Sequence, residues 1–118
     1  MLVVESDEQV STMLCVLLTR HGYSPLRADN ADDAHALCDK HATPIHLLIT
    51  NVALRHITGA ELAARLLPLC PEMKILYVSS SPQTVEGDGD GRVAFFQKPI
   101  TVAAFLQCLR KLLDADKT

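Results

Sequence analysis

Short apolar runs alternate with amphipathic segments along this chain of 118 residues. Five runs are typical of β-strands, at residues 2–5, 23–28, 45–50, 74–79 and 92–96. In four other segments apolar residues recur at three- and four-residue steps, the period of a helix with one buried face. These segments cover residues 7–21, 30–40, 59–67 and 101–113. Strands alternating with helices predict a parallel sheet covered by helices on both faces.

Local signals refine this prediction. Pro25 marks the second strand as an edge strand, because proline cannot donate to a central ladder. The nearly continuous apolar run at 45–50 is typical of a central strand buried on both faces. Residues 80–91 include E-G-D-G-D-G, and each glycine costs about 1 kcal/mol relative to alanine inside a helix. The predicted fold is therefore α/β, a doubly wound five-stranded parallel sheet with a shortened or irregular fourth helix, formed by residues 1–118 as a single domain.

Composition narrows the class of protein. Hydrophobic residues make up 48% and charged residues 21%, as in globular domains. The net charge of −3 argues against non-specific binding of nucleic acid, which needs a basic surface. No apolar run approaches the roughly 18 residues of a membrane span, and the N-terminus lacks a signal-peptide pattern. We expect a cytoplasmic domain that contacts neither nucleic acid nor membrane.

Cysteine and histidine spacing gives no sign of a metal site or a disulfide framework. The four cysteines contain no C-x-x-C pair, and their wide spacing predicts buried thiols in a reducing compartment; they are Cys15, Cys38, Cys70 and Cys108. The five histidines are expected at the surface or at loop edges; they are His21, His35, His41, His46 and His56.

Candidate site residues follow four of the predicted strands. The carboxyl ends of parallel strands meet at one edge of a sheet, and ligands bind there at a topological switch point. Four positions are expected at that edge: the pair Glu5-Ser6, then Asn51, Ser79 and Lys98.

Six short motifs occur in an order that resembles the receiver domain of two-component response regulators. They are L-V-V-E, H-G-Y, L-L-I-T-N-V, G-A-E-L, I-L-Y-V-S and F-F-Q-K-P-I-T, and the resemblance covers residues 2–114. It implies a flavodoxin-like (βα)5 fold. The fourth- and fifth-strand motifs are similar to those of receivers at the C-terminus of hybrid sensor kinases.

The resemblance also implies roles for individual residues. Receivers accept a phosphoryl group on an aspartate that ends the third strand, and Mg²⁺ is held by that aspartate and two acids after the first strand. Glu5 matches the first of these acids. Ser79 and Lys98 match the hydroxyl and the lysine that contact the phosphoryl oxygens, and Phe95 stands at the position of the aromatic residue that changes rotamer on activation.

Two central positions depart from the family pattern. Asn51 stands at the phosphoacceptor position, and its uncharged amide is no substitute for an attacking carboxylate. Ser6 stands at the second acid position, which leaves Glu5 as the one certain acid for a hard cation such as Mg²⁺. We therefore expect no bound cofactor or metal, no enzymatic activity, and a pocket closed by a Glu5–Lys98 pair.

The favoured interpretation is a pseudo-receiver, a phosphorylation-independent interaction module whose partner is a histidine kinase or an output domain. One alternative is a working phosphotransfer receiver that uses a substitute residue, with Thr50 and Asp7 as the nearest candidates. Others are an engineered Asp-to-Asn form of an active receiver, and a small-molecule binder that uses Ser79 and Lys98 in the vestigial pocket.

Overall fold

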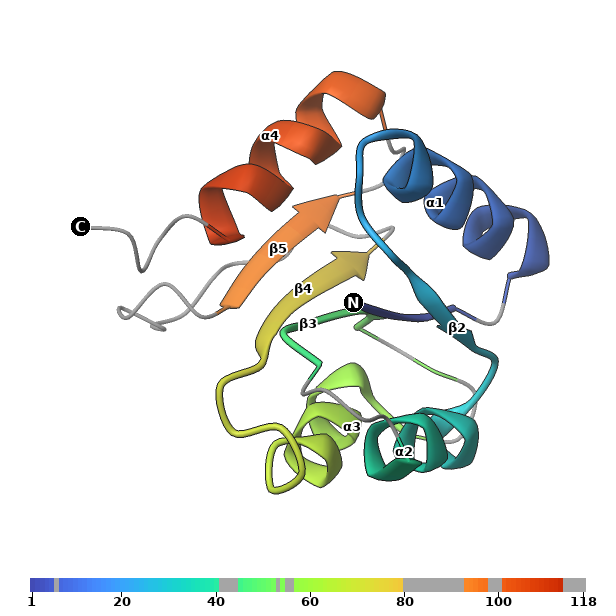
Figure 1. Cartoon of the computed structure of the whole chain (residues 1–118), viewed down its shortest axis with the longest axis vertical. Coiled ribbons are helices and arrows are strands. Elements are labelled where there is room, and N and C mark those ends of the chain that lie inside the picture. The colour runs from blue at the N-terminus through green and yellow to red at the C-terminus, as the bar shows by residue number, and fades with distance from the viewer. Residues whose placement is uncertain are drawn as a thin grey trace.

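A computed structural model describes residues 1–5, 7–40, 45–52, 54, 57–79, 93–97 and 101–113. Its strands are β1 (Leu2–Val4), β2 (Leu26–Ala28), β3 (Leu47–Asn51), β4 (Lys74–Ser79) and β5 (Val93–Gln97). They form one five-stranded sheet in the order β2-β1-β3-β4-β5, with every neighbouring pair parallel (Figure 1). The doubly wound, flavodoxin-like prediction is confirmed, and so is the edge position of the strand that follows Pro25. The expected irregular fourth helix falls in residues 80–92, which lie outside the described residues.

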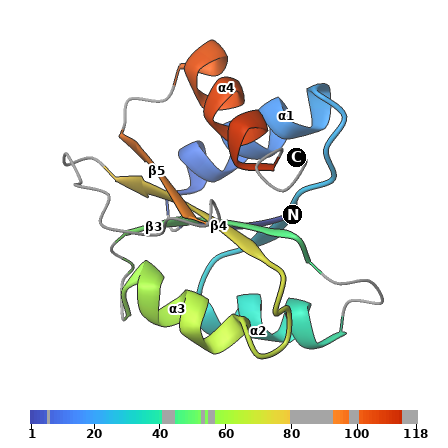
Figure 2. The same ribbon diagram turned by 90° about the vertical axis from the view of Figure 1, so that its left-hand side faces the viewer.

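The described helices cover both faces of the sheet. They are α1 (Glu8–Arg20), α2 (Ala31–Lys40), α3 (Gly59–Leu66) and α4 (Val102–Leu113). Figure 2 shows α1 and α4 on one face and α2 and α3 on the other. None of these helices has the length and apolar character needed to cross a membrane.

Each face of the sheet has its own hydrophobic core. The α1/α4 core comprises Val3, Leu14, Leu17, Leu18, Leu47, Ile49, Leu76, Val78, Phe105, Leu106, Leu109 and Leu112. The α2/α3 core comprises Leu2, Val4, Ala28, Ala34, Cys38, Ile45, Leu48, Leu62, Ala63, Leu66, Cys70, Met73 and Ile75. Alternate residues of β1, β3 and β4 point into the two cores, which is why these central strands read as continuous apolar runs.

Side chains near the ends of the helices fix where they begin. Asp7 precedes α1, and its carboxylate accepts the backbone N–H groups of Gln9 and Val10 at 3.0 and 3.3 Å. Thr58 precedes α3 and forms a capping box with Glu61, in which each side chain accepts the other residue's backbone N–H. The capping box holds the first turn of α3 close to the end of β3.

Lys74 links the sheet to the end of α4. Its side chain is only 6% exposed, although it carries a charge. The Nζ atom donates to the backbone carbonyls of Leu112 and Leu113 at 2.7 and 3.2 Å. A cation at the carboxyl end of a helix satisfies carbonyls that have no partner within the helix and complements the helix dipole.

Some details differ from the sequence-based prediction. β2 begins at Leu26 rather than residue 23, and β3 covers Leu47–Asn51 rather than 45–50. Val102 was expected on the buried side of the last helix but is 54% exposed, because it opens the first turn ahead of the residues that pack on the sheet. Met13, a member of the apolar period of α1, is 42% exposed.

The cysteine and histidine predictions are confirmed in part: Cys38 and Cys70 are buried as expected, whereas Cys15 and Cys108 are only half-buried. All four cysteines are free thiols. Among the described histidines, His21 and His46 are exposed and His35 is half-buried; His41 and His56 lie outside the described residues.

Candidate functional site

Three of the expected site residues come together at the carboxyl edge of the sheet. β1 pairs with β3 so that Val4 lies opposite Thr50, and β3 pairs with β4 so that Asn51 lies opposite Val78. Glu5 and Ser79 therefore lie on either side of Asn51 at this edge. Ser6 and Lys98, the other two expected positions, lie outside the described residues, and the predicted Glu5–Lys98 pair stays a prediction.

Glu5 and Asn51 are joined directly. The Asn51 Nδ2 atom donates to Glu5 Oε1 at 2.7 Å, and the backbone N–H of Asp7 donates to the same oxygen at 3.0 Å. Glu5 is 4% exposed, so its carboxylate has left bulk water and requires such donors. Hydrogen bonds to an ionised acceptor are short and roughly twice as strong as neutral ones. We call this contact the Glu5–Asn51 pair.

The Glu5–Asn51 pair fixes the orientation of the Asn51 amide. An ionised carboxylate only accepts hydrogen bonds, so the amide must turn its nitrogen, not its oxygen, toward Glu5. The Asn51 Oδ1 atom is buried and has no hydrogen-bond partner within the described part of the chain. The side chain therefore offers Glu5 a donor at the point where an aspartate would offer a second negative charge.

Gly59 brings α3 against the end of β3. Its backbone N–H donates to the Val52 carbonyl at 2.8 Å. A Cβ atom at this position would overlap the Asn51 carbonyl oxygen and would lie 3.1 Å from the Tyr77 ring and 3.2 Å from the Thr50 methyl group. Only glycine permits this approach, so α3 and its capping box hold the backbone on which Asn51 is displayed.

Thr50 lies on the opposite face of β3 from Asn51, as the alternation of a strand predicts. It is 1% exposed, and its hydroxyl donates to the Asn51 carbonyl at 3.2 Å. On the neighbouring strands, the Phe95 ring stacks on Tyr77 with centroids 5.0 Å apart and an interplanar angle of 26°. Burial raises the pKa of the Tyr77 hydroxyl above its ordinary value.

The acids around this edge do not gather into a cation site. Within the described ranges there is no group of three or more His, Cys, Asp or Glu residues placed to hold a metal ion. Asp7, the next acid after Glu5 in the sequence, uses its carboxylate to cap α1. Glu5 Oε1 already accepts two N–H groups. Sequence reasoning missed the Glu5–Asn51 pair, although placing both residues at the ends of adjacent parallel strands was enough to suggest it.

The family model for the response regulator receiver domain matches residues 1–110. The chain belongs to the response regulator receiver family. A relative along nearly its whole length is the response regulator receiver protein CpdR of Brucella abortus (strain 2308), which is 24% identical over 117 residues, 97% of this chain and 96% of that protein. The family expectation drawn from the six sequence motifs is confirmed.

Solved receiver structures show the same fold. The receiver domain of the hybrid histidine kinase CckA matches with a TM-score of 0.81 and 25% identity over 95% of this chain and 96% of that one. A response regulator of Burkholderia pseudomallei, solved with a phosphorylated aspartic acid, calcium ion and citrate, matches with a TM-score of 0.75 and 25% identity. The match covers 98% of this receiver and 68% of the Burkholderia chain.

Proposed function

We propose that this receiver acts in two-component signalling as a phosphorylation-independent interaction module. The observation that carries the proposal is the Glu5–Asn51 pair, a 2.7 Å hydrogen bond at the end of β3. The pair places an amide where the family resemblance implies a phosphoacceptor aspartate. Its partners in this reading are proteins of the pathway, a histidine kinase or an output domain, bound through the surface of the receiver rather than through phosphoryl transfer.

The chemistry of the amide supports this proposal. Attack on phosphorus requires an oxygen with an available electron pair, and an ionised carboxylate supplies one. In an amide the nitrogen lone pair is delocalised toward the carbonyl group, and the oxygen carries no formal charge, so it is a far weaker nucleophile than a carboxylate. Asn51 Nδ2, in addition, is engaged with Glu5. A phosphodonor that reached this edge of the sheet would therefore meet no nucleophile at Asn51.

The Mg²⁺ that the family uses is a poor fit to the described residues. Mg²⁺ holds its waters tightly and is bound through carboxylates together with substrate phosphate. The Glu5 Oε1 atom already accepts N–H groups from Asn51 and Asp7, and the Asp7 carboxylate caps α1. The sequence places Ser6, a neutral residue, at the second acid position. We therefore propose that this receiver does without the cation.

The contacts of Thr50 and Asp7 weigh against a working receiver with a substitute phosphoacceptor. The Thr50 hydroxyl is buried beneath α3 and donates to a backbone carbonyl. The Asp7 carboxylate caps α1 through two backbone N–H groups. Phosphorylation of Thr50 would remove its donor to the Asn51 carbonyl, and phosphorylation of Asp7 would remove the negative charge of the carboxyl group that caps α1.

The test is incubation with acetyl phosphate and Mg²⁺, followed by intact-mass measurement. We expect no adduct on the natural chain. A stoichiometric adduct of one phosphoryl group would contradict the proposal, and peptide mapping would then name the acceptor.

Two variants test whether Asn51 alone, or Asn51 together with Ser6, prevents phosphorylation of this receiver. The double variant Asn51→Asp with Ser6→Asp is expected to gain Mg²⁺-dependent labelling, which also proves that the assay detects phosphorylation on this scaffold. Asn51→Asp alone is expected to label more slowly, because the metal site stays one acid short. Equal labelling rates in the two variants would show that Ser6 does not impair phosphorylation. That result would favour a single Asp-to-Asn change in an otherwise active receiver.

A further inference from the structure

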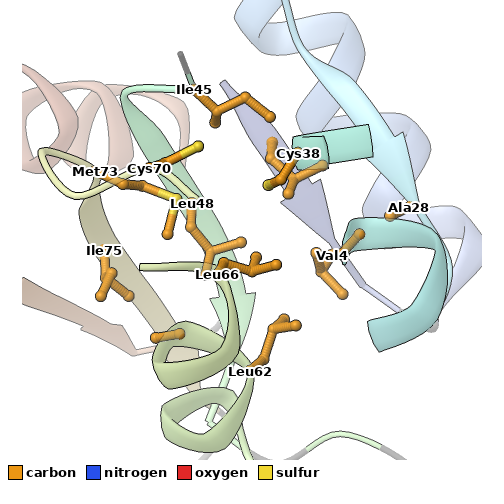
Figure 3. Close-up of a cluster of buried hydrophobic side chains, with 13 residues drawn as sticks. Val4, Ala28, Cys38, Ile45, Leu48, Leu62, Leu66, Cys70, Met73 and Ile75 are labelled. Atoms are coloured by element: carbon orange, nitrogen blue, oxygen red, sulfur yellow. The ribbon is translucent and has the colours of Figure 1, made fainter. Parts of the chain in front are cut away.

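Two buried thiols converge in the α2/α3 core, away from the Glu5–Asn51 pair. Cys38 lies in the last turn of α2 and is 8% exposed; Cys70 follows α3 and is 2% exposed. The backbone N–H of Cys70 donates to the Leu66 carbonyl at 3.0 Å, which adds one turn after the end of α3. Figure 3 shows the two sulfur atoms turned toward one another across this core.

The Cys38 thiol holds its proton tightly. Burial, followed by the charge and hydrogen bonding of the neighbouring Cys70 thiol, raises the pKa of Cys38 to about 11, so a bound cation must displace that proton. A third soft atom lies nearby, since Met73 belongs to the same core and its backbone N–H donates to the Cys70 carbonyl at 3.0 Å. The two thiols thus face one another among apolar side chains, and the N-terminal ammonium of Met1 interacts electrostatically with Cys38.

We propose that Cys38 and Cys70 form a two-thiolate site for a soft monovalent cation, Cu(I). Thiolates and thioethers are the protein ligands that select Cu(I). In the binding step one Cu⁺ replaces the two thiol protons, two sulfur–copper bonds form, and both protons pass to the buffer; no electron is transferred. The thiols are available for this step because neither is part of a disulfide.

The same surroundings disfavour the competing ions. Structural zinc takes four ligands, and no group of three or more His, Cys, Asp or Glu side chains suited to a metal occurs among the described residues. Hard cations require oxygen ligands, which the residues of the α2/α3 core do not supply from their side chains. A cation with a preference for sulfur and a need for few ligands fits the pair.

Copper bound here would tie the end of α2 to the segment between α3 and β4. A ligand that binds only the folded state raises the free energy of unfolding by about 2.7 kcal/mol at a free concentration one hundred times its dissociation constant. Bound copper should therefore raise the melting temperature of the whole domain as well as fix the two thiols.

The test uses the full chain, reduced and kept without oxygen, with Cu(I) supplied by a chromophoric chelator that competes for the ion. Because both thiols are buried, the ion is offered to the folded chain and also during refolding. We expect one Cu(I) per chain. We expect Cys38→Ser and Cys70→Ser each to bind at least about 100-fold more weakly, since loss even of an outer-shell partner costs 10- to 100-fold.

Cys15→Ser and Cys108→Ser are the matched controls. Both residues are half-buried beside the α1/α4 core on the opposite face of the sheet. Their variants should bind Cu(I) as the natural chain does. Equal loss in the control variants, or unchanged affinity in Cys38→Ser and Cys70→Ser, would overturn the proposal.

A second measurement needs no variant and so does not depend on variant folding. The natural chain, with and without prior loading, is treated with an alkylating reagent under native conditions for long enough that transient opening modifies buried thiols, and the modified positions are mapped by mass spectrometry. Joint protection of Cys38 and Cys70 by Cu(I), with Cys15 and Cys108 still alkylated, supports the site. Protection at other cysteines, no protection, or a mass that shows a Cys38–Cys70 disulfide in place of bound copper would overturn it.

Discussion

Asn51→Asp is the substitution that probes the Glu5–Asn51 pair most directly. In the natural chain the Asn51 Nδ2 atom lies 2.7 Å from Glu5 Oε1 and donates to it. An aspartate keeps the size and shape of the side chain but replaces the donor with a second carboxylate oxygen. The change therefore turns an attraction into a repulsion at a site where Glu5 is almost fully buried.

The magnitude follows from two contributions. A hydrogen bond to a charged group contributes about 1.5–3 kcal/mol to stability. Two like unit charges that relax to a separation of about 4 Å repel by roughly 4 kcal/mol at an effective dielectric constant of about 20. Protonation of one carboxyl limits the total, because a neighbouring like charge raises its pKa. We expect a loss of about 3 kcal/mol in the free energy of unfolding at neutral pH.

Urea unfolding in metal-free buffer measures this loss. The double variant Glu5→Gln with Asn51→Asp is the matched control, because the new glutamine amide can donate to the new aspartate and the hydrogen bond is restored with its direction reversed. We expect the double variant to regain most of the lost stability. The loss in Asn51→Asp should also shrink as the pH falls, since one carboxyl of the pair then takes up a proton and the repulsion ends.

Two results would refute this reasoning. Asn51→Asp as stable as the natural chain in metal-free buffer at neutral pH would mean that the Glu5–Asn51 pair contributes nothing. Failure of Glu5→Gln to recover stability in the double variant would mean that the loss does not arise from repulsion between the two carboxylates.

Other contacts give further predictions. Gly59→Ala should lower the free energy of unfolding by about 2 kcal/mol in urea titrations, because its Cβ overlaps the Asn51 carbonyl, and the overpacking forces α3 to shift. Lys74→Met should lower it by about 1–3 kcal/mol, because the last carbonyls of α4 lose a buried charged donor. Tyr77→Phe should reduce the loss of stability on raising the pH above about 10, the ordinary pKa of a tyrosine. Burial raises the Tyr77 pKa in the folded chain, so the unfolded chain ionises first.

The hydrophobic pattern of the sequence was enough to predict most of the fold. Residues 74–79 were predicted as a strand with the observed bounds, because a central strand packs against both layers and so is apolar over most of its length. The bounds of β2 were less well predicted, since an edge strand has one neighbour and its residues need little apolar character. Val102 shows a second limit of sequence-based prediction, since it was expected to be buried but is exposed. A helical period indicates which face of a helix is buried, but not how far the helix extends past the sheet.

The candidate site was predicted in part. Strand order alone was enough to place Glu5 and Asn51 at one edge, since the carboxyl ends of parallel strands meet there. Their hydrogen bond was not predicted, because opposite charge favours pairing Glu5 with Lys98, whereas an amide is also a donor to a carboxylate. The convergence of Cys38 and Cys70 could not be read from their spacing, because it depends on how α2 and the segment after α3 pack.

The proposed function has a consequence for how signals would pass through this receiver. A ligand shifts a conformational equilibrium only by its difference in affinity for the two states. With no phosphoryl group on Asn51, the ligand that drives switching in the family is lost, and Phe95 already stacks on Tyr77 rather than standing free. The Glu5–Asn51 pair also removes the charge repulsion between clustered acids that a cation would relieve. A partner would therefore meet one constant surface, so control of the pathway would rest on the amount of this protein and on competition among its partners.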